Sequence, residues 1–258
     1  MSRALPAHSP AWYVISLRPL GQHDGLRRAA ARLGARCFAL STLELCALPA
    51  RDELKQALAC PWVIVTSPAA ARFAAAQSAL RRRRGQHWFA LGRGTAAALE
   101  RAGIGEVRTP RAGSTSEALL AELPFDEMKT GRVGLITAPG GRGEIAAALS
   151  RRRIPLAVAE VYRRLVRPVA ASRLAALFEL PPRRSVLLVS SAEAFEPLWQ
   201  ACSAPQRERL RRFRFAASSE RLRAFLAERG LPACVLADDA SAGAMVAAAE
   251  AHLKGRFR

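Results

Sequence analysis

The sequence predicts an α/β fold of two doubly wound domains, each built on a parallel sheet of about five strands. Short apolar runs alternate along the chain with helical stretches of about ten to fifteen residues, which is typical of parallel sheets covered by helices. The runs contain few polar residues, as strands do when both faces of a sheet are buried. The pattern occurs twice in 258 residues, which indicates two domains.

The repeat is clearest at two strand-to-helix corners, VIVTSPAAARF at 63–73 and LLVSSAEAF at 187–195. Each corner is followed by an apolar strand, a small-residue turn and a helix that ends at glycine, then by a capped helix. Thr66 and Ser190, which occupy the same place in the two corners, are 124 positions apart. Because this spacing is nearly constant along both copies, we interpret them as a duplicated βαβαβα block.

A shorter strand–turn–helix–strand pattern precedes each block, beginning near Trp12 and again near Arg132. Two extended segments, 41–50 and 160–169, follow these βαβ units and contain or approach a proline. If they pair in antiparallel fashion, they make a two-stranded hinge between the domains. Periodicity alone leaves open whether the first βαβ unit completes the sheet of the adjacent block or of the last one.

Ligands of doubly wound sheets bind beyond the carboxyl ends of the strands. The duplicated corners would therefore face one common cleft. Their hydroxyl residues also fit the simpler interpretation of helix N-caps, which is compatible with ligand binding. The segments expected at these strand ends are Leu17–Pro19, Thr66–Pro68, Gly92–Thr95, Pro139–Arg142, Ser190–Ser191 and Ser218–Arg221.

The chain is strongly basic, with 40 Lys and Arg against 21 Asp and Glu and a net charge of +19. Such a surface favours an anionic partner. The arginine excess also fits a GC-rich genome, and the run Arg81–Arg84 fits a solvated helix end. The basic residues are spread along the chain, without a zinc finger, an RRM-like motif or a compact helix-turn-helix. We therefore favour an acidic small ligand over nucleic acid.

Other features argue against membranes, metals and nucleotides. No apolar run is long enough to span a bilayer, and the first residues lack the pattern of a signal peptide, so a cytoplasmic protein is expected. The five cysteines are scattered and the histidines isolated, which predicts reduced thiols and no metal site. The glycine-rich stretch PGGRG lacks the Gly-Lys-Ser/Thr ending of a phosphate-binding loop.

Eight motifs in order resemble the uroporphyrinogen-III synthase family, over about residues 12 to 250: LRPLGQHDGL, VIVTSPAAARF, ALGRGTAAALERAGI, SEALLAEL, RVGLITAPGGRGEIAAAL, VAEVYRRL, VLLVSSAEAF and AASSERLRAFLAERGL. The resemblance implies two flavodoxin-like domains joined by a two-stranded antiparallel ladder. It also implies the swapped pairing, with one domain of residues 1–44 plus 167–258 and the other of residues 48–163.

The family's reaction closes the linear tetrapyrrole hydroxymethylbilane to uroporphyrinogen III with loss of water and inversion of the last pyrrole ring, on the route to heme, siroheme and cobalamin. The resemblance implies an azafulvene and a spiro-pyrrolenine as intermediates, and no cofactor. A polycarboxylate substrate suits a basic cleft, since arginine and helix N-termini bind carboxylates. We expect a monomer that receives its substrate from hydroxymethylbilane synthase and binds neither membrane nor nucleic acid.

The resemblance also implies site residues. Tyr162 matches a tyrosine proposed as general acid, and a phenol is protonated at neutral pH; a half-buried hinge tyrosine is the alternative. APGGRGEI departs from the family pattern, with Arg142 one place early and Ala138 where an arginine is common. The expected substrate contacts are Arg18, Thr66, Ser67, Arg93, Thr95, Gly141, Arg142, Ser190, Ser191, Ser219 and Arg221.

Two other function classes fit the same sequence. One is a two-domain protein that binds an acidic ligand without chemistry, and the other is a basic nucleic-acid-binding regulatory module. Turnover of hydroxymethylbilane to the type III isomer separates the enzyme from the binding protein. Tight, salt-sensitive binding to duplex DNA would favour the regulatory module.

Overall fold

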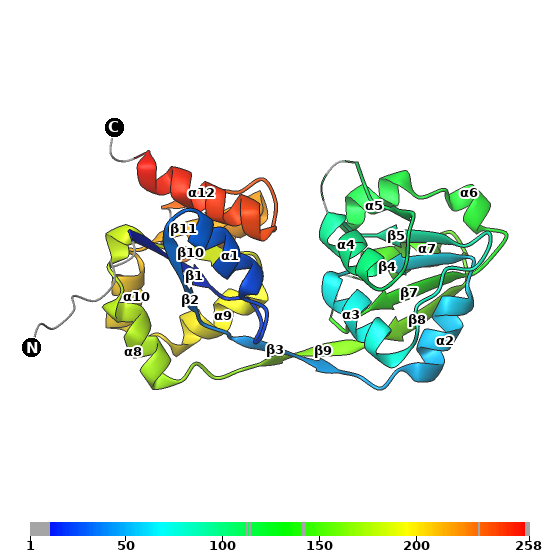
Figure 1. Ribbon diagram of the computed structural model, residues 1–258, viewed down its shortest axis with the longest axis horizontal. Helices are drawn as coiled ribbons and strands as arrows, with labels where there is room; N and C mark the ends of the chain where they lie inside the picture. The colour runs from blue at the N-terminus through cyan, green and yellow to red at the C-terminus, as the bar shows by residue number, and fades with distance from the viewer. Residues whose placement is uncertain (1–10, 112, 114, 141–142, 232, 256–258) are drawn as a thin grey trace, which may run out of the picture. The chain divides into compact units, whose positions relative to one another are not determined.

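The chain forms two compact units (Figure 1). The computed structural model describes residues 11–111, 113, 115–140, 143–231 and 233–255. Unit 1 consists of the residues up to Glu44 together with those from Leu165 onward, and unit 2 is Leu45–Arg164. Each unit has its own parallel sheet with helices on both faces, so the predicted α/β class is confirmed.

Unit 1 contains a five-stranded sheet in the order β12-β11-β10-β1-β2, all parallel. Counted along the chain this is the 2-1-3-4-5 order of flavodoxin-like sheets. Helices α1 and α12 pack on one face, and α8, α9 and α11 on the other. The elements are β1 (Trp12–Ser16), α1 (Asp24–Arg32), β2 (Ala35–Ala39), α8 (Ala171–Glu179), the 3₁₀ turn η1 (Pro182–Arg184), β10 (Ser185–Val189), α9 (Ala192–Ala201), α10 (Ala204–Leu210), β11 (Arg214–Ala217), α11 (Glu220–Ala227), β12 (Cys234–Leu236) and α12 (Ala242–Lys254).

Unit 2 has the corresponding sheet in the order β6-β5-β4-β7-β8, again parallel throughout. Helices α2, α3 and α4 cover one face, and α5, α6 and α7 the other. The elements are α2 (Arg51–Ala59), β4 (Trp62–Val65), α3 (Pro68–Gln77), β5 (His87–Ala90), α4 (Arg93–Arg101), β6 (Val107–Arg108), α5 (Ser116–Glu122), α6 (Phe125–Met128), β7 (Val133–Thr137), α7 (Glu144–Arg151) and β8 (Leu156–Glu160).

A two-stranded antiparallel ladder pairs β3 (Leu43–Ala47) with β9 (Tyr162–Val166), as the sequence predicted. The chain passes from one unit to the other within these two strands. The sheets also settle the open question of pairing, because β1 pairs with β10 of the last block and β4 pairs with β7. The first βαβ unit thus lies in the sheet of the last block, and the second lies in the sheet of the first block.

The two units have the same strand arrangement, and their residues can be aligned one by one. β4 and β10 take the same place in their sheets, and so do β7 and β1, although β7 follows its block and β1 precedes its own. In the βαβ parts, equivalent positions are 119 apart: Gly21 and Gly140 both adopt positive φ, at 76° and 73°. The same spacing aligns Leu43 with Tyr162, which are both buried. Side chains of the βαβ part of unit 2 can therefore be compared one by one with those of unit 1.

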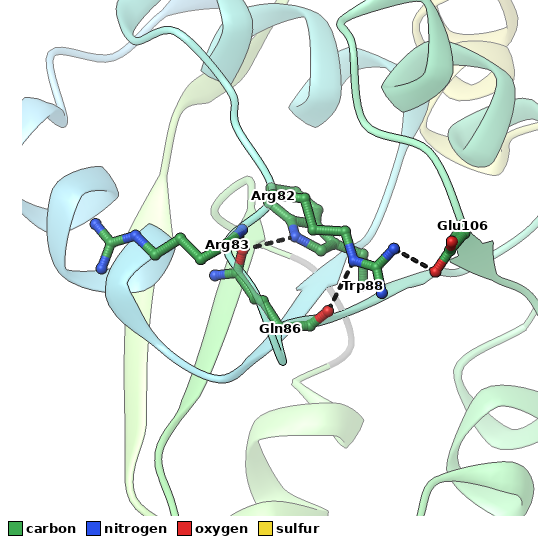
Figure 2. A network of polar contacts seen from close by, with 5 residues as sticks. All are labelled: Arg82, Arg83, Gln86, Trp88 and Glu106. Carbon is green, nitrogen blue, oxygen red and sulfur yellow. Dashed lines mark hydrogen bonds and ion pairs between the residues drawn. The ribbon is translucent and has the colours of Figure 1, made fainter.

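The arginine run 81–84 is exposed, as the interpretation of a solvated segment requires, but it lies in the loop between α3 and β5 and not at a helix end. Arg82 donates to the Gln86 carbonyl at 2.9 Å and pairs with Glu106 (Figure 2). The Gln86 side chain is buried and accepts hydrogen bonds from the Arg83 amide and the Trp88 indole, while donating to the carbonyls of Leu58 and Cys60. These bonds fasten the loop to α2 and β5.

Candidate functional site

A cavity of about 390 Å³ lies in unit 2, beyond the carboxyl ends of β4, β7 and β8. The strand order reverses between β4 and β7, so the cavity occupies the topological switch point at which doubly wound sheets bind ligands. The N-cap residue of α3, the start of α5 and the first turn of α7 also contribute to it. Its main polar lining residues are Thr66, Ser67, Thr137, Glu144, Glu160 and Arg164.

Hydroxyl groups meet at the base of this cavity. The Thr66 hydroxyl donates to the Thr137 hydroxyl at 2.9 Å, and this bond joins the ends of β4 and β7. Ser67 caps α3 by accepting a hydrogen bond from the Ala70 amide at 3.0 Å. The capping interpretation of Ser67 is therefore confirmed, and both corner residues also line the cavity.

Tyr162 lies next to this corner. Its side chain is 3 % exposed, stacks on Phe73 with ring centroids 5.3 Å apart, and places its hydroxyl oxygen 3.1 Å from the Ser67 hydroxyl oxygen. Gln77 holds the adjoining backbone by donating to the Val161 carbonyl at 3.2 Å. The strand β9 thus places the Tyr162 phenol beside Ser67, the residue that caps α3, and the contacts with Phe73 and Gln77 hold it there.

Arg164 is a cavity residue that the sequence analysis did not single out. Its guanidinium donates to the Tyr162 hydroxyl at 3.4 Å and to the Pro139 carbonyl at 3.5 Å. The signal for it was present, because residues two apart in a strand point to the same side, which places Arg164 beside Tyr162. Thr137 was also missed, although it ends an apolar strand much as Thr66 follows one.

The part of the cavity lining that the structure describes does not share the strongly basic character of the whole chain. Among its described lining residues, Arg164 is accompanied by the carboxylates of Glu144 and Glu160. Hydroxyl groups and backbone amides are therefore the donors that it offers most readily to an anion. The carboxylates suit the N–H groups or the positive charge of a ligand better than its acidic side chains.

The other predicted residues of unit 2 lie apart from the described lining. Arg93 is exposed at the first position of α4, and Thr95 is buried two residues later. Gly141 and Arg142 fall outside the described residues. Of the predicted set in this unit, the structure therefore brings together Thr66, Ser67 and Tyr162.

The predicted residues of unit 1 cluster at the matching edge of its own sheet. Ser191 caps α9 and Ser219 caps α11, each by accepting an amide hydrogen bond at 3.4 Å. Ser190 is half-buried and Arg221 is exposed. Arg18 is already engaged within the unit, because its guanidinium donates to the Ala240 carbonyl just before α12.

The pocket described at the switch point of unit 1 is small, at about 10 Å³, and Leu17, Arg18 and Ser190 are among its lining residues. Arg18 stands where unit 2 has Thr137, and it spans the opening to Ala240. His23 is 4 % exposed, and its ring nitrogens lie 2.8 Å and 2.7 Å from the hydroxyls of Ser16 and Ser41. These two serines stand where unit 2 has the lining residues Leu135 and Glu160.

Fold and cavity together define a duplicated α/β protein with an open ligand pocket at the switch point of one sheet. The family model for uroporphyrinogen-III synthase HemD matches residues 24–247. Since the match spans most of the chain, the chain belongs to the uroporphyrinogen-III synthase family. No curated protein matches the sequence.

Two solved structures resemble this fold over nearly its whole length. A mutant uroporphyrinogen III synthase from the extremely thermophilic bacterium Thermus thermophilus is 20% identical with a TM-score of 0.60, over 95% of this chain and 100% of the other. The enzyme from Helicobacter pylori is 16% identical with a TM-score of 0.62, over 96% and 99%. At these identities the likeness shows the shared architecture.

Family membership decides among the function classes that the sequence left open. The chain is a uroporphyrinogen-III synthase, a cyclising lyase of tetrapyrrole biosynthesis. In the part of the chain that the structure describes, no helix has the length and apolar character needed to cross a membrane. Over the same residues, His, Cys, Asp and Glu side chains form no group of three or more suited to a metal ion.

Proposed function

We propose that the cavity of unit 2 holds the hydroxymethyl end of the substrate, and that Tyr162 is the source of the proton with which its hydroxyl leaves as water. The observation that carries this proposal is the 3.1 Å contact between the Tyr162 and Ser67 hydroxyls, with Ser67 lining the cavity. A phenol hydroxyl is a hydrogen-bond donor and can act as a general acid.

The rest of the site has the task of orientation. Once the C–O bond breaks, the pyrrole nitrogen supplies the electron pair, and the substrate's own carbon atoms close the ring. Holding a flexible chain in a nearly cyclic shape lowers the entropy cost of that closure. The carboxylates of Glu144 and Glu160 line the same cavity and suit the cationic character that develops on the pyrrole.

Substrate contacts are proposed at the carboxyl-end turns of both sheets. Arg18 does not belong to this set, because its guanidinium donates a hydrogen bond to the Ala240 carbonyl. We assign it a structural role. Gly141 and Arg142 stay candidates from the sequence alone. The proposed contacts in the described turns are Thr66, Ser67, Arg93, Thr95, Ser190, Ser191, Ser219 and Arg221.

We further propose that the chain acts as a cytoplasmic monomer that takes its substrate directly from hydroxymethylbilane synthase. The scattered cysteines and strongly basic composition support the first two points. The spontaneous closure of free hydroxymethylbilane to the type I isomer supports the third. The two units are proposed as the domains, with boundaries near residues 44–48 and 163–167.

The test is turnover of freshly prepared hydroxymethylbilane with analysis of the isomers formed. The wild-type protein should yield mainly the type III isomer, whereas type I alone at the spontaneous rate would refute the proposal. Replacing Tyr162 by Phe should lower kcat by about 100-fold or more, because general acids contribute that much. Tyr13, in β1 of unit 1, supplies the matched control, and Tyr13→Phe should retain the wild-type rate.

A further inference from the structure

We infer that Tyr162 does not protonate the substrate directly, and that Ser67 carries the proton from Tyr162 to the leaving hydroxyl while Arg164 fixes the direction of transfer. This inference rests on the proposed function. Ser67 and Tyr162 differ in their access to the cavity. Ser67 and Arg164 line the cavity, whereas Tyr162 is 3 % exposed and lies behind them. A group that faces the substrate must therefore stand between the phenol and the reacting oxygen.

The direction of the relay follows from the donors and acceptors around Tyr162. A guanidinium only donates hydrogen bonds, so the phenol oxygen must accept the one from Arg164, at 3.4 Å. The phenol's own hydrogen is then available to its other neighbour, the Ser67 oxygen at 3.1 Å. Arg164 thereby orients the Tyr162 hydroxyl toward Ser67.

The hydrogen bonds that Ser67 accepts also determine the direction of its own hydroxyl hydrogen. A serine oxygen has two acceptor positions and one hydrogen. The Ala70 amide takes one acceptor position at 3.0 Å, and the Tyr162 hydroxyl takes the other. The hydrogen of Ser67 is left for the remaining direction, and the cavity that Ser67 lines offers the place for the substrate hydroxyl.

Transfer along this path is balanced. The Ser67 hydrogen moves to the hydroxymethyl oxygen as its C–O bond breaks, water leaves, and the Tyr162 hydrogen moves to Ser67. The resulting phenolate faces the Arg164 guanidinium, and the N-terminus of α3 stabilises negative charge on Ser67 during transfer. The proton that the closing pyrrole releases when it regains aromaticity returns along the same path to Tyr162.

Unit 1 keeps the cap and lacks the relay. Ser191 accepts a hydrogen bond from the Ala194 amide, just as Ser67 accepts one from the Ala70 amide. At the position of Tyr162, however, unit 1 has the buried Leu43. The hydroxyl corner therefore serves as a helix cap in both units, while the phenol behind it is present only in unit 2. This difference separates the proton-transfer function from the capping function.

The test is a double-mutant cycle on kcat. Ser67→Asn keeps a capping oxygen and removes the transferable hydrogen, so we expect kcat to fall by about 100-fold with KM nearly unchanged. Ser67→Thr restores a hydroxyl and should recover most of the rate. The double variant Ser67→Asn/Tyr162→Phe should be no slower than the slower single variant, because both remove the same proton path.

Ser241, which caps α12 by the same amide bond at 3.2 Å, gives the matched control. Ser241→Asn should leave kcat unchanged, and thermal melting of each variant shows that it folds. A near-normal kcat for Ser67→Asn beside a slow Tyr162→Phe would overturn the relay and make Tyr162 the direct acid. Multiplying effects in the double variant, or a change in KM alone, would also overturn it. Full activity of Tyr162→Phe would instead refute the proposed function.

Discussion

The switch points of the two units lie on separate sheets with the same strand arrangement, and they differ in the side chains that line them. Unit 2 leaves a cavity of about 390 Å³, and unit 1 leaves about 10 Å³. Arg18 replaces Thr137, and His23 lies between the two serines that replace Leu135 and Glu160. A duplicated fold thus supplies two equivalent places for a ligand, and local side chains decide which of them stays open.

The largest effect is expected from giving unit 2 the residue of unit 1. Thr137→Arg places a long side chain in the cavity and removes the hydroxyl partner of Thr66, so the substrate loses its position. We expect kcat/KM to fall by about 100-fold or more, as small misplacements at a reacting centre do. Isomer analysis of the product from hydroxymethylbilane measures it.

Thr130→Arg provides the control for added charge, because Thr130 is exposed in the turn after α6. It should leave kcat/KM close to that of the wild type. If Thr137→Arg retains full activity, the cavity of unit 2 is not where the reacting end of the substrate binds, and the contrast between the units loses its functional meaning.

A moderate effect on stability is expected in unit 1. Arg18→Met removes the hydrogen bond to the Ala240 carbonyl, and loss of one such bond costs about 1 kcal/mol of unfolding free energy. Chemical denaturation measures this, while KM for hydroxymethylbilane should stay unchanged. A higher KM without loss of stability would show instead that Arg18 binds substrate, as the sequence analysis expected.

A smaller, pH-dependent effect is expected at His23. Burial lowers its pKa, assisted by Arg27 and, more weakly, by Arg18 and Arg173, against the opposing charge of Asp24. Below pH 6.5, the ordinary value, the unfolded chain therefore binds a proton that the folded chain does not, and stability falls as the pH is lowered. His23→Gln should flatten the dependence of the melting temperature on pH between about pH 7 and pH 5. An unchanged slope would contradict this assignment.

Much of the fold followed from local patterns in the sequence. Fully buried strands such as β4 and β10 appear in the sequence as continuous apolar runs, and serine caps marked the starts of α3, α9 and α12. Helices α2, α6, α8 and α10 were not predicted. The sheet pairing could not be derived from periodicity, because both arrangements bury the same apolar residues and differ only in long-range contacts.

The site was harder to predict than the fold. Corner residues such as Thr66 and Ser67 follow from the rule that ligands bind at strand ends, and the structure places both in the cavity. Tyr162 was named through the family resemblance. Its contact with Ser67 joins residues 95 positions apart, and such a contact depends on how the strands assemble. The hydrogen bond from Arg18 to the Ala240 carbonyl likewise joins residues that are distant in sequence.

The most direct test of the central claim is a crystal structure of the protein with uroporphyrinogen III bound. The unequal switch points predict that part of the product enters the cavity of unit 2, with one of its atoms within hydrogen-bonding distance of the Ser67 hydroxyl. In unit 1, Arg18 and His23 should keep the hydrogen bonds described above. A product that leaves the unit 2 cavity empty, or that displaces Arg18 and His23 to enter unit 1, would contradict the account.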